Sequence, residues 1–391
     1  KMNEKLNYPL TFSSWDYKEI LEIQKVIKSG QFTYASEVKN FEKKYAQFFK
    51  MKHAIMVNSG SSANLVSIAS LFFKKKRPLK KGDEVIVPAI SWSTTYSPLQ
   101  QYGLKLKFVD VDFDTLNIDT EKLKKAISKK TKLIVLVSIL GNPCNIYEIA
   151  KICKDRKIFL MEDNCESLGA KYKNKYTGTS GDINTMSFFY SHHISAIEGG
   201  MVTTNNDELA DLIRSIRSHG WTRDVKNLKN LGYSKKKFET YQFILPGYNV
   251  RPTEINAATG ATQLKKLNNL IKERRKNFTL YQKIFRKNKI FHIQKENGFS
   301  SSFSFVFIFK KKYLKFKNKI YEDLKKNNIQ YRLITGGCFT KHPVKKYFDY
   351  KIFNNLNNAN YIHDNGFFLG NAPYNLEEQL IHFNKVIIKY Y

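Results

Sequence analysis

The feature that most constrains the fold is a series of short, continuously apolar segments that alternate with helical patterns between residues 53 and 204. Continuous apolar strands separated by helices are typical of a parallel sheet covered on both faces, so we expect an α/β fold with a mainly parallel central sheet. In such sheets, ligands bind beyond the carboxyl ends of the strands. The predicted strands are 53–59, 84–90, 106–111, 133–140, 158–161, 185–190 and 201–204, and the predicted helices include 63–73, 147–155 and one capped by Asp119 or Thr120.

The pattern changes after residue 263, which predicts a second, smaller domain. A long basic helix is expected over 264–287, and a strand over 302–309 precedes a helix over 317–327. We therefore predict an N-terminal segment and large domain over residues 1–264, and a small C-terminal α+β domain over residues 265–391. The Asn-rich stretch 354–360 is expected to be a surface loop.

The composition is that of a globular protein with an unusual charge. Among 391 residues, 42% are hydrophobic, and 29 Phe with 23 Tyr exclude disorder over most of the chain. The net charge of +32 is typical of proteins that bind nucleic acid or another polyanion. However, the excess is spread over short runs such as 74–77, 235–237 and 310–312, and Lys, Asn and Ile are abundant throughout. We therefore favour an AT-rich coding sequence as the cause and expect no nucleic-acid partner, with the question open at this point.

Other patterns exclude a membrane span and a disulfide framework. No stretch approaches the roughly 18 apolar residues of a membrane helix, and residues 1–16 contain no secretory signal pattern. We therefore expect a cytoplasmic protein without a membrane partner. The four cysteines lie at irregular spacings, which predicts reduced thiols and no zinc site: Cys144, Cys153, Cys165 and Cys338.

Two predicted strand ends carry candidate chemistry. Residues 58–64 contain Gly60 and Ser61 between a strand and a helix, where free N–H groups favour an anion such as a phosphate, although a plain capped turn fits as well. Glu162 and Asp163 end a buried strand. A carboxylate there can keep the ring nitrogen of pyridoxal phosphate protonated, and a helix cap is an equal alternative.

A third strand end, residues 187–200, contains the adjacent His192 and His193 and ends in a glycine pair. Neighbouring residues in an extended segment point in opposite directions, and no acidic or Cys residue lies at ligand spacing. We therefore expect no metal at these histidines.

Taken together, these motifs resemble the DegT/DnrJ/EryC1/StrS sugar aminotransferase family of fold type I pyridoxal phosphate enzymes. The resemblance covers about residues 32–264, and weaker similarity extends to residues 370–371. It implies an aspartate-aminotransferase-like fold and a homodimer with shared active sites, in which Asn249 reaches the neighbouring subunit's phosphate. The matching landmarks are the Ser-Gly-Ser cup at 59–62, Trp92, Glu162 with Asp163, the loop from Ser187, His219 with Gly220, and 247–254.

One departure from the family pattern carries most of the functional information. Family aminotransferases have a lysine five residues after the loop serine, where it forms a Schiff base with the cofactor, and this chain has His192 there. An imidazole cannot form that bond, but it can transfer protons near neutral pH. The pattern resembles the 3-dehydratase branch, which uses pyridoxamine 5'-phosphate, bound non-covalently and interconverted with pyridoxal 5'-phosphate.

Within that branch, one type reduces its intermediate through an iron–sulfur cluster held by four cysteines. Beyond Cys165 this chain has only Cys338, so that cluster cannot be built. The resemblance therefore points to the other type, similar to GDP-4-keto-6-deoxymannose 3-dehydratase, which takes its amine from L-glutamate.

The resemblance also implies roles for individual residues. His192 is the expected proton-transfer group and Asp163 the partner of the ring nitrogen. Glu166, in place of the usual Gln, is expected beside the cofactor's 3-hydroxyl, and Trp92 on the ring face. The phosphate is assigned to Gly60, Ser61, Ser187 and Asn249. Substrate or glutamate contacts are assigned to Arg251, His219 and Arg332; a surface Arg251 and a structural His219 remain open, and His193 is expected to be structural.

The predicted activity is removal of the C3 hydroxyl from a 4-keto-6-deoxysugar that is linked to a nucleotide. We favour GDP as that nucleotide. The sugar is a hexose or a heptose, and the 4-keto-3,6-dideoxysugar product would serve surface polysaccharide biosynthesis. Two alternatives stay open: a nucleotide-sugar aminotransferase, and a non-catalytic protein whose basic surface binds nucleic acid.

Overall fold

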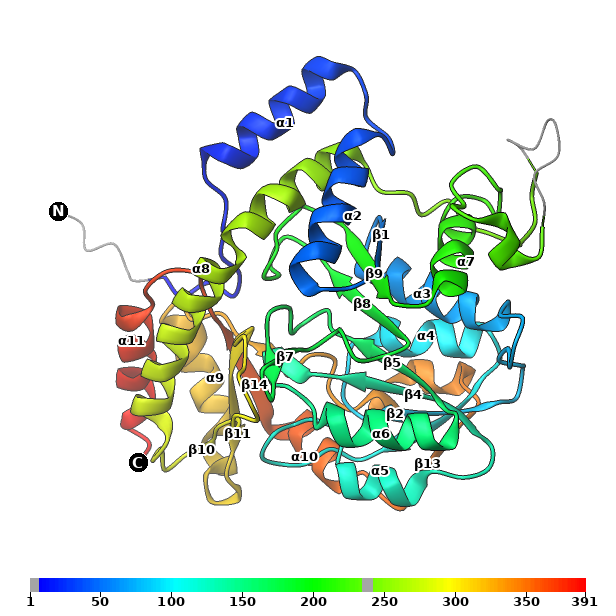
Figure 1. Cartoon of the computed structure of the whole chain (residues 1–391). Helices are drawn as coiled ribbons and strands as arrows, with labels where there is room; N and C mark the ends of the chain where they lie inside the picture. The colour runs from blue at the N-terminus through cyan, green and yellow to red at the C-terminus, as the bar shows by residue number, and fades with distance from the viewer. Residues whose placement is uncertain (1–6, 234–241) are drawn as a thin grey trace.

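The computed structural model describes residues 7–233 and 242–391 and is built around an eight-stranded sheet (Figure 1). The strand order is β1-β9-β8-β5-β4-β2-β3-β13. All strands are parallel to one another except β9, which is antiparallel to both of its neighbours, so the predicted mainly parallel sheet is confirmed. The strands are β1 (His53–Val57), β2 (Glu84–Pro88), β3 (Lys105–Val109), β4 (Thr131–Val137), β5 (Phe159–Asp163), β8 (Ile183–Ser187), β9 (Gly200–Thr204) and β13 (Tyr350–Ile352).

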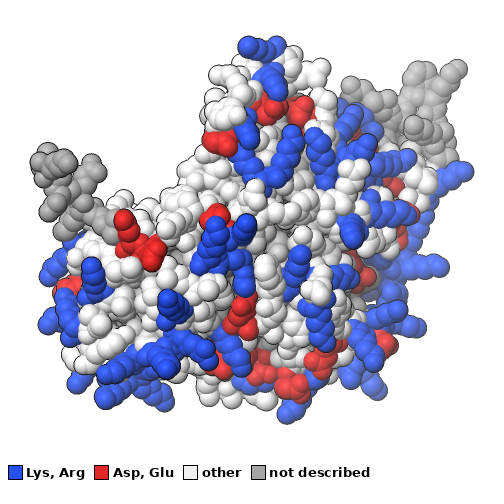
Figure 2. Space-filling model, turned by 60° about the vertical axis from the view of Figure 1, so that its left-hand side comes forward, with Lys and Arg blue, Asp and Glu red and all other residues white. Residues whose placement is uncertain are grey.

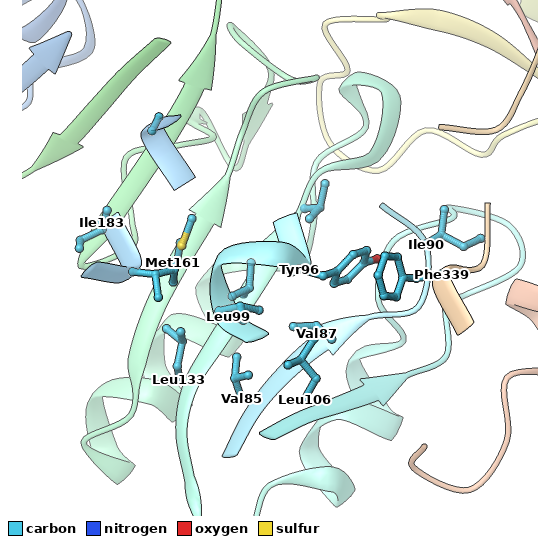
Figure 3. Packing of buried hydrophobic residues seen from close by; sticks show 14 of the residues in the cluster. Val85, Val87, Ile90, Tyr96, Leu99, Leu106, Leu133, Met161, Ile183 and Phe339 are labelled. Atoms are coloured by element: carbon cyan, nitrogen blue, oxygen red, sulfur yellow. The ribbon is translucent and has the colours of Figure 1, made fainter. Parts of the chain in front are cut away.

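Helices cover both faces of this sheet because successive strand side chains point to opposite faces. On β2, Val85 and Val87 belong to a buried cluster that includes residues of α3 (Gly60–Phe72) and α7 (Asp207–Arg217). Figure 3 shows part of this cluster, in which Tyr96 of α4 (Ser93–Gln101) also packs. Ile86, between the two valines, belongs to the cluster on the other face. That cluster contains residues of α5 (Thr120–Ala126) and α6 (Ile146–Arg156).

A smaller antiparallel sheet forms the C-terminal part, with the order β10-β11-β14-β12. Phe305 and Phe307 of β11 face an aromatic core against the helices, whereas Val306, between them, packs into the core of the large sheet. The two sheets are therefore joined by a continuous apolar contact. The elements are β10 (Phe291–His292), β11 (Ser304–Phe309), β12 (Arg332–Leu333), β14 (Gly366–Gly370), α8 (Glu254–Phe285), α9 (Lys317–Lys326), α10 (Asn357–Asn365) and α11 (Glu377–Ile388).

The remaining described elements are short or peripheral. Two N-terminal helices pack against α8, and a two-stranded hairpin lies between β5 and β8 in sequence. They are α1 (Tyr17–Ser29), α2 (Ser36–Phe49), β6 (Lys171–Tyr172) and β7 (Lys175–Tyr176), with short 3₁₀ helices at Ile139–Gly141, Leu228–Leu231, Lys311–Phe316, Phe339–Lys341 and Pro343–Tyr347.

Two element boundaries differ clearly from the sequence predictions. The long helix α8 begins at Glu254 and not at residue 264, because Thr253 caps it and its first turns are buried on most sides, which removes the apolar periodicity. The predicted loop at 354–360 is wrong from Asn357 onward, where α10 begins. The Asp110 carboxylate accepts hydrogen bonds from the N–H groups of Asn358 and Ala359, so a residue distant in sequence caps this helix.

The predicted domain boundary at 264/265 stays a prediction, and several segments cross it. Helix α8 runs through the boundary without interruption, and β13 pairs with β3 of the large sheet. At the other end of the chain, Tyr8 pairs with Ile329 and its hydroxyl donates to the Gly370 carbonyl, 2.9 Å away. The first described residues therefore pack on the small C-terminal part.

Basic side chains are scattered over the face drawn in Figure 2, with acidic side chains among them. This distribution supports the compositional interpretation of the net charge over a single polyanion-binding patch on that face. The basic run at 235–237 lies outside the described residues. Among the helices of the described ranges, none combines the length and hydropathy that crossing a membrane requires.

Candidate active site

A cavity of about 330 Å³ lies where the ends of β2, β5 and β8 and the turn after β1 meet the small C-terminal part. On the side of the large sheet, most lining residues follow a strand, as the α/β pattern predicts, and the N-terminal residues Leu10, Thr11 and Phe12 also line the cavity. The C-terminal part closes it with Phe303, Asn371 and the predicted Arg332. The other predicted site residues that line the cavity are Gly60, Ser61, Trp92, Asp163, Glu166, Ser187 and His192.

The turn from β1 into α3 forms a cup of backbone N–H groups. Ser59 caps α3 by accepting from the Ser62 N–H at 3.0 Å, and the Ser61 hydroxyl donates to Thr94. A Cβ on Gly60 would lie 2.6 Å from the Cβ of Ser187, so only glycine lets the cup approach β8 this closely. Because the first N–H groups of a helix have no partner within it and carry a partial positive charge, this cup fits a phosphate group.

Asp163, at the end of β5, is held by donors on both of its carboxylate oxygens. Its Oδ2 accepts from Asn64 at 2.9 Å and Thr95 at 2.8 Å, and its Oδ1 accepts from the Cys165 N–H at 3.3 Å. The Thr185 hydroxyl orients the Asn64 amide by donating to its oxygen. The carboxylate is therefore buried, fixed and turned toward the cavity. Sequence reasoning missed Asn64 and Thr95, although both lie in motifs that it singled out.

Glu166 also lines the cavity and is half-buried. Its carboxylate accepts from the Leu140 N–H at 3.0 Å and from the Thr335 hydroxyl, which joins the two parts of the molecule across the cavity. Burial raises the pKa of Glu166 above its ordinary value. Leu140 adopts a left-handed conformation, with φ at 53°, which aims its N–H at the carboxylate. Thr335 was missed because no local sequence signal links it to Glu166.

His192 lies in a turn after β8, and not in the extended segment assumed from the sequence. Its backbone N–H donates to the Phe189 carbonyl, and its ring meets Phe303 edge-on at 5.2 Å between centroids. Burial lowers its pKa to about 4, so the imidazole is neutral at pH 7. Its buried Nδ1 has no hydrogen-bond partner among the described residues, which leaves a free polar atom beside the cavity.

His193 turns away from the cavity toward the C-terminal part. One ring nitrogen, Nε2, lies 3.1 Å from the Ser301 carbonyl, and burial lowers the pKa of the ring well below its ordinary value. This arrangement agrees with the structural role expected for His193. No lysine lines the cavity in the part of the chain that the structure describes, so His192 is the basic group that follows β8 there.

Three predicted site residues do not line this cavity: His219, Asn249 and Arg251. They lie together in a separate region, which we call the loop region and which comprises the described residues 218–233 and 242–251. Asn249 accepts a hydrogen bond from the Arg251 Nε at 3.0 Å, and the His219 ring meets Trp221 edge-on. One chain by itself therefore brings these residues to one another and not to His192. Asn249 was expected to act in a neighbouring subunit, so its position outside the cavity is compatible with that expectation.

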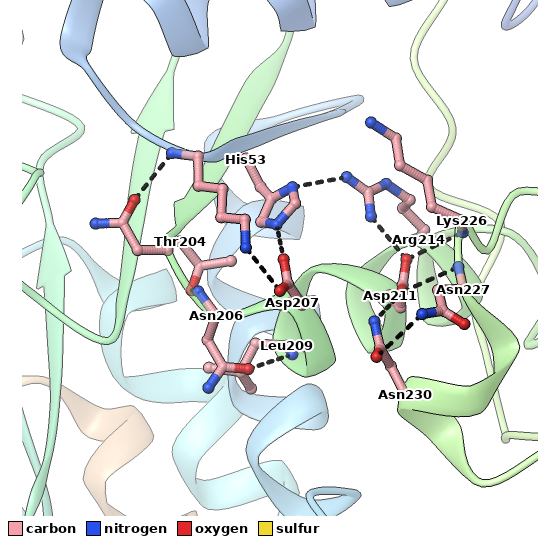
Figure 4. A network of polar contacts seen from close by, with 12 residues as sticks. His53, Thr204, Asn206, Asp207, Leu209, Asp211, Arg214, Lys226, Asn227 and Asn230 are labelled. Atoms are coloured by element: carbon pink, nitrogen blue, oxygen red, sulfur yellow. Dashed lines mark hydrogen bonds and ion pairs between the residues drawn. The ribbon is translucent and has the colours of Figure 1, made fainter.

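The start of this loop region is anchored to α7 by the polar network of Figure 4. The Asp211 carboxylate accepts from the Arg214 guanidinium at 2.7 Å and from the N–H groups of Lys226 and Asn227. His53 lies between Arg214 and Asp207, 2.6 Å from a carboxylate oxygen of the latter. These contacts fix the start of the loop region, whereas Phe243, in its second described part, is 63% exposed.

Comparisons with known proteins agree with this geometry. The model of the DegT/DnrJ/EryC1/StrS aminotransferase family matches residues 14–383. The chain is 48% identical over 386 residues to GDP-4-keto-6-deoxy-D-mannose 3-dehydratase of Escherichia coli O55:H7, covering 98% of this chain and 100% of that protein.

Two solved structures are also similar. The crystal structure of a GDP-4-keto-6-deoxymannose-3-dehydratase with a trapped PLP-glutamate geminal diamine has a TM-score of 0.95 at 48% identity, covering 97% of this chain and 100% of that one. A mutant of a protein of that name, with bound GDP-perosamine, has a TM-score of 0.94 at the same identity and coverage. The chain has the aminotransferase fold that the sequence predicted and belongs to the DegT/DnrJ/EryC1/StrS aminotransferase family.

Proposed function

We propose that this chain is a pyridoxamine phosphate- and glutamate-dependent 3-dehydratase of a GDP-linked 4-keto-6-deoxysugar. The main observation behind the proposal is His192, a half-buried and neutral imidazole at the position where family aminotransferases have their lysine. A site with this residue keeps a base for proton transfer but cannot hold the cofactor covalently. The similar proteins named above, which share 48% of their residues with the chain, support the GDP sugar, the cofactor and glutamate.

The residues around the cavity fit the cofactor. The cup at Gly60 and Ser61, with Ser187 beside it, would hold the phosphate, and the Asp163 carboxylate would face the ring nitrogen. Trp92, which is 52% exposed at the cavity, would cover one face of the ring. When bound, pyridoxamine phosphate supplies an electron sink that stabilises negative charge on the carbon next to its ring. Asp163 would strengthen that sink by keeping the ring nitrogen protonated.

His192 would move the protons that this chemistry requires. Its neutral imidazole accepts a proton from the cofactor's aminomethyl carbon and then donates a proton to the departing C3 hydroxyl of the sugar. The overall conversion balances without another reductant. The sugar exchanges a C3–OH for a C3–H, a two-electron reduction, while glutamate is oxidised to 2-oxoglutarate and releases ammonia.

The proposal includes a homodimer with shared active sites. Asn249 and Arg251 lie outside the cavity of their own chain, in a surface region that a second copy can meet. Asn249 would then complete the phosphate site of the partner subunit, with Arg251 and His219 near its substrate. The sugar, hexose or heptose, the use of the product in surface polysaccharide, and a cytoplasmic location remain predictions.

An isotope experiment separates the proposed function from the alternative aminotransferase. The purified protein is incubated with pyridoxamine phosphate, ¹⁵N-glutamate and GDP-4-keto-6-deoxymannose, and the sugar product is analysed by mass spectrometry. A dehydratase releases the label as ammonia, and its sugar product has lost one oxygen atom. Label retained in the sugar would instead identify an aminotransferase, and salt-sensitive binding of DNA without turnover would favour the nucleic-acid alternative.

The role of His192 is tested by the variant His192→Lys. We expect a new absorbance band from cofactor bound covalently to the lysine, together with loss of dehydration, because the tethered lysine competes for the same cofactor carbon. The wild-type protein, treated identically, should give only the spectrum of unattached cofactor. Full dehydration by His192→Lys would contradict the role of His192.

A further inference from the structure

Arg274 of α8 carries a buried positive charge next to the cavity wall. Arg274 is only 4% exposed. Its Nη1 donates hydrogen bonds to the carbonyls of Phe303, at 3.1 Å, and Asn371, at 2.9 Å. Within the described residues, no ion pair joins this guanidinium to a carboxylate, and its Nε has no hydrogen-bond partner. A buried charge without a counter-ion is costly, so carbonyl contacts alone are a poor reason to keep an arginine there.

The two carbonyls belong to chain segments that form the cavity. Residues 300–303, which we call the wall segment, are held on one side by the backbone, where Phe303 donates to the Leu140 carbonyl. On the other side, the Asn371 amide donates to the Ser302 carbonyl at 2.9 Å and to the Arg274 carbonyl at 3.1 Å. Arg274 therefore closes a ring of contacts that fixes the wall segment against α8.

Both His192 and His193 contact the wall segment. The Phe303 ring lies 5.2 Å from the His192 ring and 5.7 Å from the His193 ring, between centroids, and the Ser301 carbonyl bonds His193. The guanidinium is thus separated from His192 by one residue. A change at Arg274 is transmitted to the imidazole through Phe303.

Arg274 also acts on His192 electrostatically. Burial is the main cause that lowers the pKa of His192, the backbone at Ser187 opposes it, and the nearby Arg274 charge lowers it further. The same charge lowers the pKa of His193. The other titratable groups that share this cavity or turn with His192 are His193, Asp163, Cys165, Glu166, Tyr190, Glu198 and Arg332.

We propose that Arg274 is a positioning residue for His192: it clamps the wall segment against the imidazole and places a positive charge near it. The catalytic consequence rests on the proposed function of His192, whereas the clamp and the charge effect do not. Like charges in a buried region disfavour one another, so a fixed guanidinium opposes protonation of its neighbour.

The test compares Arg274→Gln, Arg274→Lys and the control Arg275→Gln. Arg275 is the next residue on α8 and also reaches the wall segment, through the Ser300 carbonyl at 3.2 Å, but its charge is paired with Glu296. The pKa of His192 is measured by NMR with labelled histidine in the protein without cofactor, and its signal is assigned by its loss in His192→Gln. Circular dichroism checks that each variant is folded.

We expect Arg274→Gln to raise the pKa of His192 by about one unit, which is the size typical of losing one nearby charge. Arg274→Lys should leave that pKa nearly unchanged, since it keeps the charge, and Arg275→Gln should not shift it. A folded Arg274→Gln without a shift, or an equal shift in Arg275→Gln, would overturn the proposal. If Arg274→Gln does not fold, a raised pKa in Arg274→Lys would overturn it as well.

The holoenzyme gives a second readout. In Arg274→Gln, the acid limb of the pH profile of kcat/KM should move to higher pH, because the imidazole protonates earlier, while Arg275→Gln keeps the wild-type limb. If Arg274→Gln instead loses activity equally at every pH, and the acid limb of its pH profile does not move, Arg274 has only a structural role and the proposed charge effect is wrong. Since the NMR titration needs no substrate, failure of the proposed function would leave its result standing.

Discussion

Two regions of this molecule carry the predicted site residues, and they behave differently. The strand-end region, residues that follow β1, β2, β5 and β8, gathers its side chains around one cavity within a single chain. The loop region, residues 218–233 and 242–251, keeps its predicted site residues together but outside that cavity. The sheet topology explains the first result, because parallel neighbouring strands end at the same edge. No comparable rule places a long loop.

The comparison teaches which predictions depend on one chain alone. Asp163 and His192 follow neighbouring parallel strands, so their proximity follows from the strand order. Asn249 and Arg251 can act at a cavity only if a second copy presents them. Substitutions in the two regions should therefore affect activity differently when a variant is assayed alone and when two variants are mixed.

The largest effect is expected in the strand-end region, from His192→Gln. Loss of a positioned proton-transfer group should reduce dehydration by about 10²- to 10⁴-fold. The measurement is product formation at saturating cofactor and glutamate, with chemical denaturation as the control that the fold is intact. Activity within tenfold of the wild type would show that another group moves the proton.

Subunit mixing tests the loop region. Asn249→Asp places a negative charge against the expected phosphate and should by itself abolish most activity. When Asn249→Asp and His192→Gln subunits are unfolded and refolded together, half of the dimers should be mixed, and each mixed dimer should have one intact site, which restores about a quarter of wild-type activity. Each variant refolded alone is the control. No recovery in the mixture would contradict shared active sites.

A smaller effect is expected from Gly60→Ala in the cup. The added methyl group would lie 2.6 Å from the Cβ of Ser187, so the turn or β8 must shift and the N–H groups lose their alignment. We expect roughly tenfold weaker cofactor binding, equivalent to about 1.4 kcal/mol. Titration with pyridoxal phosphate, followed by absorbance, measures this. Unchanged affinity would place the phosphate elsewhere.

The smallest effect concerns stability at low pH. The pKa of His192 is about 4 in the folded chain and 6.5 ordinarily, because burial disfavours the charged ring. Between these values the unfolded chain binds a proton that the folded chain does not, so stability falls as the pH decreases through this window. In His192→Gln, the dependence of the unfolding free energy on pH should be shallower by about one proton.

Urea denaturation at pH 7 and at pH 5 measures this difference. His219→Gln, in the loop region, is the comparison variant. A change of slope as large in His219→Gln as in His192→Gln would contradict burial at the cavity as the cause.

Much of the site was predictable because its residues lie in local motifs. The cup around Gly60, the carboxylate at Asp163 and the replacement of lysine by His192 are each recognisable within a few residues. The distant residues that hydrogen-bond to site residues or cap helices were not predictable in the same way. Thr335 contacts Glu166 across a sequence separation of 169 residues, and Asp110 caps α10 across a separation of 248 residues.

The sequence by itself determined the alternation of strands and helices, the order of the cofactor motifs and the type of side chain at position 192. These properties are local, so periodicity and spacing reveal them. Only the tertiary structure decided the state of that side chain. His192 is neutral because segments distant in sequence enclose it: the Phe303 ring packs edge-on against the imidazole, and the Arg274 guanidinium holds the Phe303 carbonyl. Burial and buried charge depend on which segments meet, and this information is not contained in any single motif.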